Sequence, residues 1–398
     1  NWTRNINNNT YFDFDNPINF NIKSEFAQVF PNPNPLGKAY IDDFESSKSI
    51  SYVSLNFMDW KKSSRPFYIE SETQIDDDED GLFDDILFPK IEKNKDRLDM
   101  YFYNPYKEVK TQDIWPEVEV TTTADNKTIR TLWMELDKDS DYIDNNIFID
   151  ELGNSISEYY WNGMTFSLSE NDQDQSKNKY LDVWLNDSKV DDLVSLYFDL
   201  GTINEDINGD NILNSEDIPE LNSTIGNEQL DKDEDIGLDG CEDDYENGWG
   251  QCLNQQSQTY QEILYSSNDE LKKLINLFTD PDDPNRDNYD YDAKQEPPDY
   301  SRINGSEGNK KLKRLPETED LNNDRQLNTT NTYFSKRIKI GQLAENYEYL
   351  SSESGVDDNN DGAPDWKLFR IPLAEFESFN NPSWNYIKNI RVWAGTTD

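Results

Sequence analysis

Histidine is absent from this chain of 398 residues, which also has only two cysteines and four methionines. Without an imidazole there is no Ser–His or Cys–His nucleophile, no histidine-bound catalytic metal and no histidine proton shuttle. Two cysteines cannot supply a zinc site of four cysteine ligands. We therefore expect a protein that is not an enzyme, although a glycosidase that uses two carboxylates stays open. Cys241 and Cys252 fit either one disulfide in an oxidising compartment or two unlinked thiols.

Basic residues are also in short supply, because 37 Lys and Arg stand against 82 Asp and Glu, for a net charge of −45. Such a charge repels nucleic acid and anionic lipid and attracts cations, so we expect no nucleic-acid partner. No apolar run is long enough for a transmembrane helix, and no signal peptide opens the chain. We interpret the chain as a piece of a longer exported protein. Aromatic residues, at 13%, are frequent enough to build a core.

Short apolar or alternating segments recur between polar loops, a pattern typical of antiparallel strands. We predict an all-β fold of β-sandwich modules, of jelly-roll or galactose-binding type, joined by long acidic loops with few short helices. The expected parts are a lead-in over 1–35, a first sandwich over 36–200, an acidic connector over 201–330 that cannot build a core of its own, and a second, truncated sandwich over 331–398. The predicted strands are 39–44, 50–58, 98–103, 129–136, 164–168, 180–185, 194–200, 333–340, 366–373 and 387–394.

The stretch with the clearest metal-binding pattern is the loop over 206–217. Positions 1, 3, 5, 9 and 12 of this loop are occupied by Asp206, Asn208, Asp210, Asn214 and Asp217, and the backbone carbonyl of Ile212 falls at position 7. At this spacing a folded loop surrounds one calcium ion with oxygen ligands. Two residues depart from the pattern, since Asn211 replaces the turn glycine and Asp217 the closing glutamate. The alternative interpretation is a solvated acidic loop.

Three further loops carry oxygen-bearing side chains at related spacing. Their residues are Asp76, Asp78, Asp80 and Asp84 in one loop, Asp320, Asn322 and Asp324 in another, and Asp357, Asn359, Asp361 and Asp365 in the last. Four loops favour calcium more strongly than one loop does. We predict structural Ca²⁺ ions that relieve repulsion between carboxylates and stiffen the loops locally.

Eight short motifs follow one another along the chain. They are KAYIDDFESSKS (38–49), YLDVWLN (180–186), LYFDLGTINEDINGDNILNSED (196–217), LDKDEDIGLDG (230–240), RINGSEGN (302–309), LPETEDLNND (315–324), NTYFSKRI (331–338) and LFRIPLAEF (368–376). In this order, from about residue 25 to its end, the chain resembles the gliding-motility SprA/Sov family of very large outer-membrane proteins. That family forms the translocon barrel of the type IX secretion system. The resemblance implies that the chain is a segment of a protein several times longer.

The function implied by this resemblance is that of a non-catalytic part of a protein-export channel, with soluble β modules beside an outer-membrane barrel. Its partners would be the remainder of the barrel, accessory proteins of the secretion system and exported cargo. Its location would be the cell outer membrane, at the cell surface or on the periplasmic face. The alternative is a secreted, calcium-stabilised glycan-binding or adhesive module. Exposed aromatic residues lining a shallow groove would favour that alternative, whereas buried aromatic residues favour the export segment.

Overall fold

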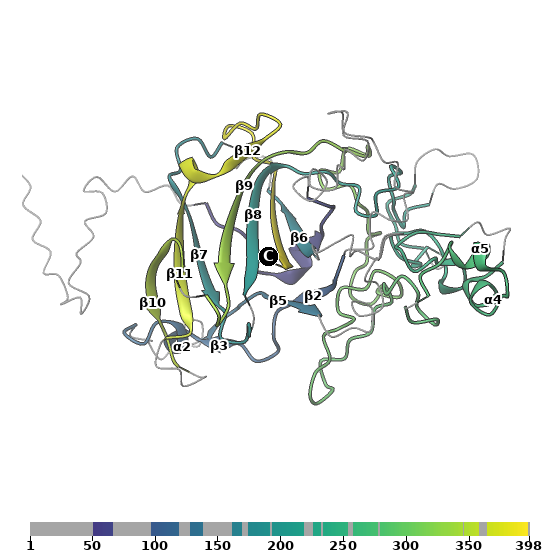
Figure 1. Cartoon of the computed structure of the whole chain (residues 1–398), viewed down its shortest axis with the longest axis horizontal. Helices are drawn as coiled ribbons and strands as arrows, with labels where there is room; N and C mark the ends of the chain where they lie inside the picture. Colours follow the sequence, from purple (N-terminus) through teal and green to yellow (C-terminus); the bar gives the residue numbers. More distant parts are fainter. Residues whose placement is uncertain are drawn as a thin grey trace, which may run out of the picture. The chain divides into compact units, whose positions relative to one another are not determined.

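The structure is a computed structural model that describes residues 51–66, 97–118, 128–137, 161–168, 174–191, 193–218, 226–231, 234–253, 258–277, 279–344, 346–357 and 364–396. These residues form several antiparallel sheets with three short α-helices, which confirms the predicted all-β, sandwich-like fold class (Figure 1). No helix in these ranges is both long and apolar enough to cross a membrane. The predicted strand at 39–44 and the predicted ligands Asp76, Asp78, Asp80, Asp84, Asn359 and Asp361 lie outside the described residues.

The main sheet has six strands in the order β1-β6-β13-β8-β9-β12. These strands are β1 (Trp60–Lys62), β6 (Trp161–Ser167), β8 (Val194–Thr202), β9 (Thr332–Ile340), β12 (Glu377–Phe379) and β13 (Asn389–Thr396). A three-stranded sheet contains β10 (Leu350–Ser354), β11 (Trp366–Pro372) and β7 (Tyr180–Asn186), in that order. Two strand pairs complete the β structure, namely β2 (Asp99–Tyr103) with β5 (Trp133–Asp137), and β3 (Val109–Lys110) with β4 (Thr128–Ile129).

The apolar core lies between the six-stranded and three-stranded sheets. Because side chains alternate across a strand, β8 turns Leu196, Phe198 and Leu200 toward this core. They belong to the same buried cluster as Phe369 and Ile371 of β11. Figure 1 shows β7, β10 and β11 running alongside β8 and β9. Burial of these side chains away from water supplies the main driving force for the sandwich.

The opposite face of the six-stranded sheet is buried too, but it carries charged and aromatic side chains. Asp199 of β8 and Arg391 of β13 face each other across the strand pair, and both are 0% exposed. Arg391 Nε donates to Asp199 Oδ2 over 2.7 Å, and Trp393 Nε1 donates to the same oxygen over 2.9 Å. The Arg391 guanidinium also lies 4.7 Å from the ring centre of Tyr333. A hydrogen-bonded ion pair therefore holds this face together.

Strands that precede the connector in the sequence pair with strands that follow it, in the same sheets. β8 pairs along its whole length with β9 and β13, and β7 pairs with β11. The described residues therefore form one sandwich in place of the two expected over 36–200 and 331–398. Alternation along a segment indicates a strand, but it carries no information about which distant strand becomes its neighbour.

Other differences are local. Of the predicted strand at 50–58, residues 51–56 belong to no helix or strand and lead into the 3₁₀-helix η1 (Phe57–Asp59), with β1 starting at Trp60. The short helix α5 (Asp269–Lys272) is capped by the side chain of Asn268. The described residues also contain the helical turns α2 (Thr111–Ile114), α4 (Tyr260–Leu264), η4 (Asp243–Tyr245) and η5 (Leu373–Glu375).

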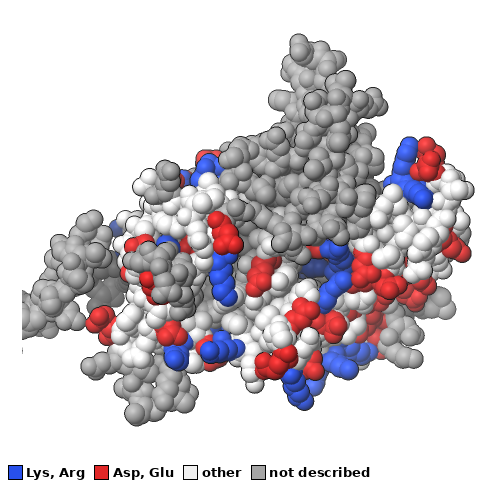
Figure 2. Space-filling view, turned by 60° about the horizontal axis from the view of Figure 1, so that its bottom comes forward, with Lys and Arg blue, Asp and Glu red and all other residues white. Residues whose placement is uncertain are grey.

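The connector over 201–330 does contain a small core of its own, contrary to the expectation. Tyr260, Ile263 and Ile275 are nearly inaccessible to solvent and pack together with Leu253 around α4 and α5. The capping box of α4, in which Thr259 and Glu262 satisfy each other's backbone N–H groups, fixes the start of this helix. Figure 2 shows that acidic side chains on one face of the molecule gather in several patches, with Lys or Arg beside many of them.

Candidate metal centre in paired acidic loops

Two acidic loops lie where the connector leaves and rejoins the sandwich. The first acidic loop, residues 205–217, follows the end of β8, and the second, residues 319–331, leads into β9. β8 and β9 are antiparallel neighbours, with Thr202 opposite Thr332. The sheet itself therefore brings the two loops together.

The first acidic loop is folded around the carboxylate of Asp206. Asp206 Oδ1 accepts hydrogen bonds from the N–H groups of Gly209 (2.8 Å) and Asp210 (3.1 Å), and Oδ2 accepts from Asn211 (3.0 Å). Asn208 Oδ1 accepts from the Asp210 N–H over 3.1 Å. The chain turns this tightly because Gly209 and Asn211 have φ angles of 76° and 60°. Asn211 thus adopts the left-handed conformation for which glycine is the usual residue.

The second acidic loop repeats this arrangement. Asp320 Oδ1 accepts from the N–H groups of Asn322 (3.1 Å) and Asp324 (3.3 Å), and Oδ2 accepts from Arg325 (2.6 Å). Asn322 Oδ1 accepts from the Asp324 N–H over 2.8 Å. Asn323 and Arg325 occupy the left-handed region with φ angles of 59° and 62°. Positions 4 and 6 therefore have the same backbone conformation in both loops.

Each loop sends a glutamate into the other. Glu319 accepts hydrogen bonds from the N–H groups of Ile207 (2.8 Å) and Asn214 (3.0 Å) in the first loop. Glu205 accepts from Leu321 (3.1 Å) and Asn328 (2.9 Å) in the second loop.

The backbones of the two loops are also joined. The Glu205 N–H donates to the Asn328 carbonyl over 2.9 Å, and the Glu319 N–H donates to the Asn214 carbonyl over 3.0 Å. The same contacts thus occur twice, with the roles of the loops exchanged. We call this reciprocal arrangement the loop clasp.

The carboxylates of the loop clasp are withdrawn from water. Asp206, Glu319 and Asp320 are 5%, 2% and 4% exposed. Burial, with the charges of Asp206 and Asp210 adding to it, raises the pKa of Glu319 to about 8 despite the backbone hydrogen bonds that lower it. Burial also raises the pKa of Glu205 and of Asp206. The nearby Lys61 ammonium donates to the backbone carbonyls of Thr318 and Asp320 over 2.7 and 3.0 Å. Charged carboxylates are thus costly here unless a cation joins them.

The structure brings most of the predicted ligands of the two loops together. Asp206, Asn208 and Asp210 are joined by hydrogen bonds in the first loop, and Asp320, Asn322 and Asp324 in the second. Asn214 lies near the first group, with Nδ2 3.4 Å from Asp210 Oδ2. The Ile212 side chain is exposed, and its N–H donates to Asp210 Oδ1 over 2.6 Å.

Asp217, predicted to close the first loop, instead serves a different turn. Its two oxygens accept from the N–H groups of Asn227 (2.8 Å) and Glu228 (3.0 Å). In the last predicted loop, Asp357 is exposed and Asp365 is buried, while the residues between them include the two predicted ligands outside the described ranges. That loop and the loop at 76–84 remain predictions.

The glutamates of the loop clasp were not among the predicted residues. A signal for them exists, because a glutamate directly precedes the first aspartate of both loops, as Glu205 and Glu319. Glu216 was also missed. It is 1% exposed, its Oε2 accepts from the Glu317 N–H over 2.7 Å, and burial raises its pKa to about 8.

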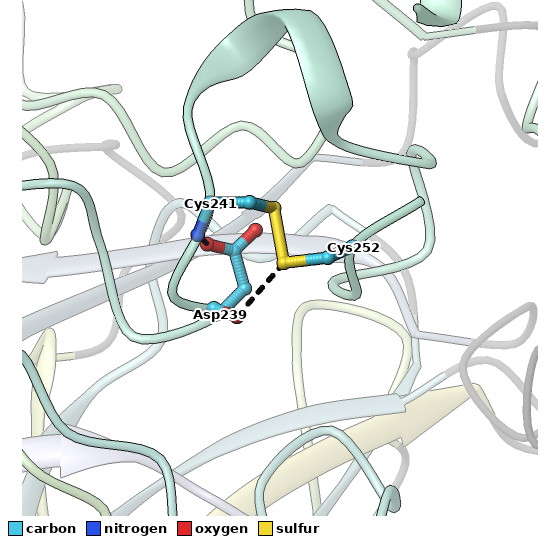
Figure 3. A group of neighbouring side chains, drawn as sticks. All are labelled: Asp239, Cys241 and Cys252. Carbon is cyan, nitrogen blue, oxygen red and sulfur yellow. Dashed lines mark hydrogen bonds between the residues drawn. A yellow bond between two sulfur atoms is a disulfide. The ribbon is translucent and has the colours of Figure 1, made fainter. Parts of the chain in front are cut away.

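A disulfide closes another acidic loop of the connector. Cys241 and Cys252 are bonded, with their Cα atoms 5.8 Å apart. The Cys241 N–H donates to Asp239 Oδ1 over 3.1 Å, and Cys252 Sγ lies 3.0 Å from the Asp239 carbonyl oxygen (Figure 3). Because the sulfurs are bonded to each other, they are not thiolates and do not supply metal ligands here. The disulfide is thus a structural cross-link beside an acidic residue.

The two acidic loops contain the donor atoms that a hard cation requires, which are carboxylate and amide oxygens with backbone carbonyls nearby. Sequence comparison finds no matching family model and no matching curated protein.

Proposed function

We propose that this chain is a non-catalytic, structural segment of a type IX protein-export channel of the outer membrane, in which the two acidic loops bind Ca²⁺. The loop clasp is the observation that supports cation binding. The ordered motifs from KAYIDDFESSKS to LFRIPLAEF support the export role. The two parts of the proposal are tested separately.

Calcium fits the donor set better than zinc does. Each loop offers two carboxylates and one amide oxygen at positions 1, 3 and 5, on a chain already turned by left-handed residues. Calcium takes six to eight oxygen ligands in flexible geometry, and the carbonyl at position 7, the asparagine at position 9 and water would complete the shell. Zinc prefers nitrogen and sulfur ligands, which these loops lack. The ion would relieve the repulsion between carboxylates that the fold holds together.

Because the loop clasp links the two acidic loops, calcium bound in either loop would stabilise the position of the connector. Glu205 and Glu319 hold backbone N–H groups of the opposite loop, so a change in one loop reaches the other. Since the loops sit at the ends of β8 and β9, bound calcium would fix the connector to the sandwich. The proposed role is mechanical, namely to keep a long acidic insertion in one arrangement.

Thermal unfolding with and without calcium tests this part. Calcium bound only by the folded chain at 100 times its Kd stabilises it by about 2.7 kcal/mol per site, on the order of 5 °C in Tm. The double variant Asp206→Asn/Asp320→Asn should lose most of this rise. Asp269→Asn, an exposed change of equal charge on α5, should keep it. An unchanged Tm of the wild-type chain at millimolar calcium would refute structural calcium in these loops.

The burial of the tryptophan side chains favours a scaffold for export over a sugar-binding surface. Nine of the ten Trp fall within the described residues, and none of the nine is exposed. An in-frame deletion of 51–396 from the parent gene, in a gliding bacterium that secretes through the type IX system, should stop delivery of cargo to the cell surface. If the shortened protein is present in the outer membrane and cargo still reaches the cell surface normally, the export role is overturned. This result would not bear on the calcium sites.

One hollow favours the alternative of a glycan-binding module. It encloses about 460 Å³ and is lined by Asn56, Phe57, Met58, Asn104, Pro105, Tyr106, Glu108, Arg130 and Thr131. Tyr106 is 71% exposed and could stack on a sugar ring, with amide and charged groups beside it. Binding of oligosaccharides that is lost in Tyr106→Ala and kept in Tyr265→Ala, another highly exposed tyrosine, would support this alternative.

A further inference from the structure

A group of five carboxylates lies in the connector, apart from the residues of the loop clasp. The carboxylate cluster consists of Asp239, Asp243, Glu246, Asp287 and Glu307. Ligand oxygens of Asp239, Glu246 and Asp287 lie within 4.8 Å of one another, and so do those of Asp243, Glu246 and Glu307. Glu246 therefore belongs to both groups of three. The cluster joins the disulfide-closed loop to two segments that follow it in the chain.

Buried oxygens in this cluster lack hydrogen-bond donors. Glu246 is 0% exposed, and its Oε2 accepts from the Asn285 N–H over 2.6 Å, but no described residue donates to Oε1. Asp287 is 7% exposed, and its Oδ2 accepts from Ser306 Oγ over 3.3 Å, while Oδ1 has no donor in the part of the chain that the structure describes. Glu307 Oε2 is also buried, and none of the described groups donates to it. Native proteins rarely leave such oxygens unsatisfied, because a buried acceptor loses its hydrogen bonds to water and gains none in return.

The positive charges near the cluster do not balance it. Burial and the charge of Asp239 raise the pKa of Asp287 to about 7, and Lys62 opposes only part of this rise, because one ammonium cannot offset five carboxylates. Arg302 forms its ion pair with Asp283, and Arg286 pairs with Asp99. Burial also raises the pKa of Glu246 and of Glu307.

We propose that the carboxylate cluster is a second type of cation site, binding a hard divalent ion of the calcium class with Glu246 as the shared ligand. Asp239 and Asp287 approach Glu246 as one group, and Asp243 and Glu307 as the other. All five donors are oxygens, which favours calcium or magnesium over zinc or copper. The burial of Glu246 and Asp287 favours calcium, because magnesium releases its water shell reluctantly.

The bound ion would cross-link three parts of the connector. The Glu307 N–H already donates to the Asp287 carbonyl over 2.9 Å, and the Tyr289 N–H donates to the Glu307 carbonyl over 2.7 Å. The disulfide Cys241–Cys252 closes the loop that carries Asp243 and Glu246, and Asp239 lies two residues before Cys241. An ion at Glu246 would thus tie this loop to 287–307. The proposal does not rest on the loop clasp, since the two sites share no residue.

Calorimetric titration of Ca²⁺ into the chelator-treated chain tests the proposal. Glu246→Gln should bind at least one equivalent of Ca²⁺ less than the wild-type chain. Glu242→Gln makes the same change of charge at an exposed position of the same loop and should bind the full number. Asp206→Asn/Asp320→Asn should lose only the equivalents that belong to the loop clasp. Unchanged stoichiometry and affinity in a folded Glu246→Gln chain would overturn the cluster site alone.

A second measurement keeps the proposal testable if Glu246→Gln does not fold. Wild-type crystals soaked in Tb³⁺, which replaces Ca²⁺ at oxygen sites, should give an anomalous peak within about 2.6 Å of a Glu246 oxygen. A peak at Asp206 or Asp320 without one at Glu246 would overturn the cluster site and leave the loop sites standing. A peak at Glu246 without one at Asp206 or Asp320 would support the cluster site and overturn the loop sites.

Discussion

Replacing Asp199 with asparagine should destabilise the sandwich more than any similar change at its surface. Asp199 Oδ2 accepts from Arg391 Nε and Trp393 Nε1, and Arg391 Nη2 lies 2.7 Å from the same oxygen. Asparagine keeps an acceptor of similar size but removes the negative charge. Arg391 would then be a buried cation without a partner charge, between Asp199 and the ring of Tyr333.

The expected loss in free energy of unfolding is about 3 kcal/mol. Breaking a buried ion pair by removing one partner costs about 3–5 kcal/mol, and the amide oxygen of asparagine recovers part of one hydrogen bond. Against the total stability of a typical domain, about 5–15 kcal/mol, this is a large fraction. Removing both charges with Asp199→Leu and Arg391→Met should cost less than Asp199→Asn alone, because no buried charge is left unpaired.

The chain contains a matched control in the other sheet. Asp182 of β7 and Arg370 of β11 also face each other across a strand pair, and Arg370 Nε and Nη2 donate to the two Asp182 oxygens over 2.9 and 2.8 Å. Their side chains are 41% and 31% exposed, so Asp182→Asn should cost at most about 1 kcal/mol. Urea unfolding followed by Trp fluorescence measures both variants. If the two variants lose free energies of unfolding that differ by less than about 1 kcal/mol, burial does not decide how much each ion pair contributes to stability, and the reasoning is refuted.

Two further predictions concern the connector. In the presence of a chelator, the free energy of unfolding should fall as pH rises from about 4.5 to about 8. Burial raises the pKa values of Glu216 and Glu319 to about 8, so both groups stay protonated in the folded chain over this range. The unfolded chain loses the same protons from about pH 4.5 upward, and the difference destabilises the folded chain. Calcium should reduce this fall because it stabilises the charged carboxylates. Urea unfolding midpoints at pH 5, 7 and 8.5 measure the effect. Midpoints in chelator that stay equal or rise with pH would contradict the prediction. Reduction of Cys241–Cys252 should cost up to about 3 kcal/mol and speed hydrogen exchange within 241–252 while leaving β8 and β9 protected. Equal acceleration in the sheet would show that the disulfide acts on the whole fold.

The strands could be predicted from the sequence because their pattern is local. Leu196, Phe198 and Leu200 alternate with Tyr197 and Asp199 along β8, so the segment shows both its period and its two faces. The partners of β8 could not be predicted in the same way. They are β9 and β13, which lie beyond the connector, and their pairing depends on burial of both sheets at once. The predicted division into two sandwiches failed at this point.

The candidate sites show the same limit. The spacing of Asp206, Asn208 and Asp210 marks the first acidic loop, but Glu319, which completes the clasp, lies 112 residues from its partner Ile207. The carboxylate cluster has no regular spacing, since its ligands come from segments around 239–246, 287 and 307. A sequence pattern finds a site whose ligands lie in one loop. It does not find one assembled by the fold from several segments.

If the two proposed sites bind calcium, burial of acidic residues would make the connector depend on cations in a way that the sandwich does not. The sandwich pairs its buried Asp199 with Arg391 and its buried Asp187 with Lys367, beside a core of apolar side chains. The connector buries Glu216, Glu246, Asp287 and Glu319, and none of these four forms an ion pair within 4.0 Å among the described residues. Such carboxyl groups are stable when they hold a proton or share a metal ion, and near neutral pH a metal ion lets all of them stay charged and still satisfied. Calcium concentration would therefore set how firmly the connector is held, while the sheets to which it is attached stay folded.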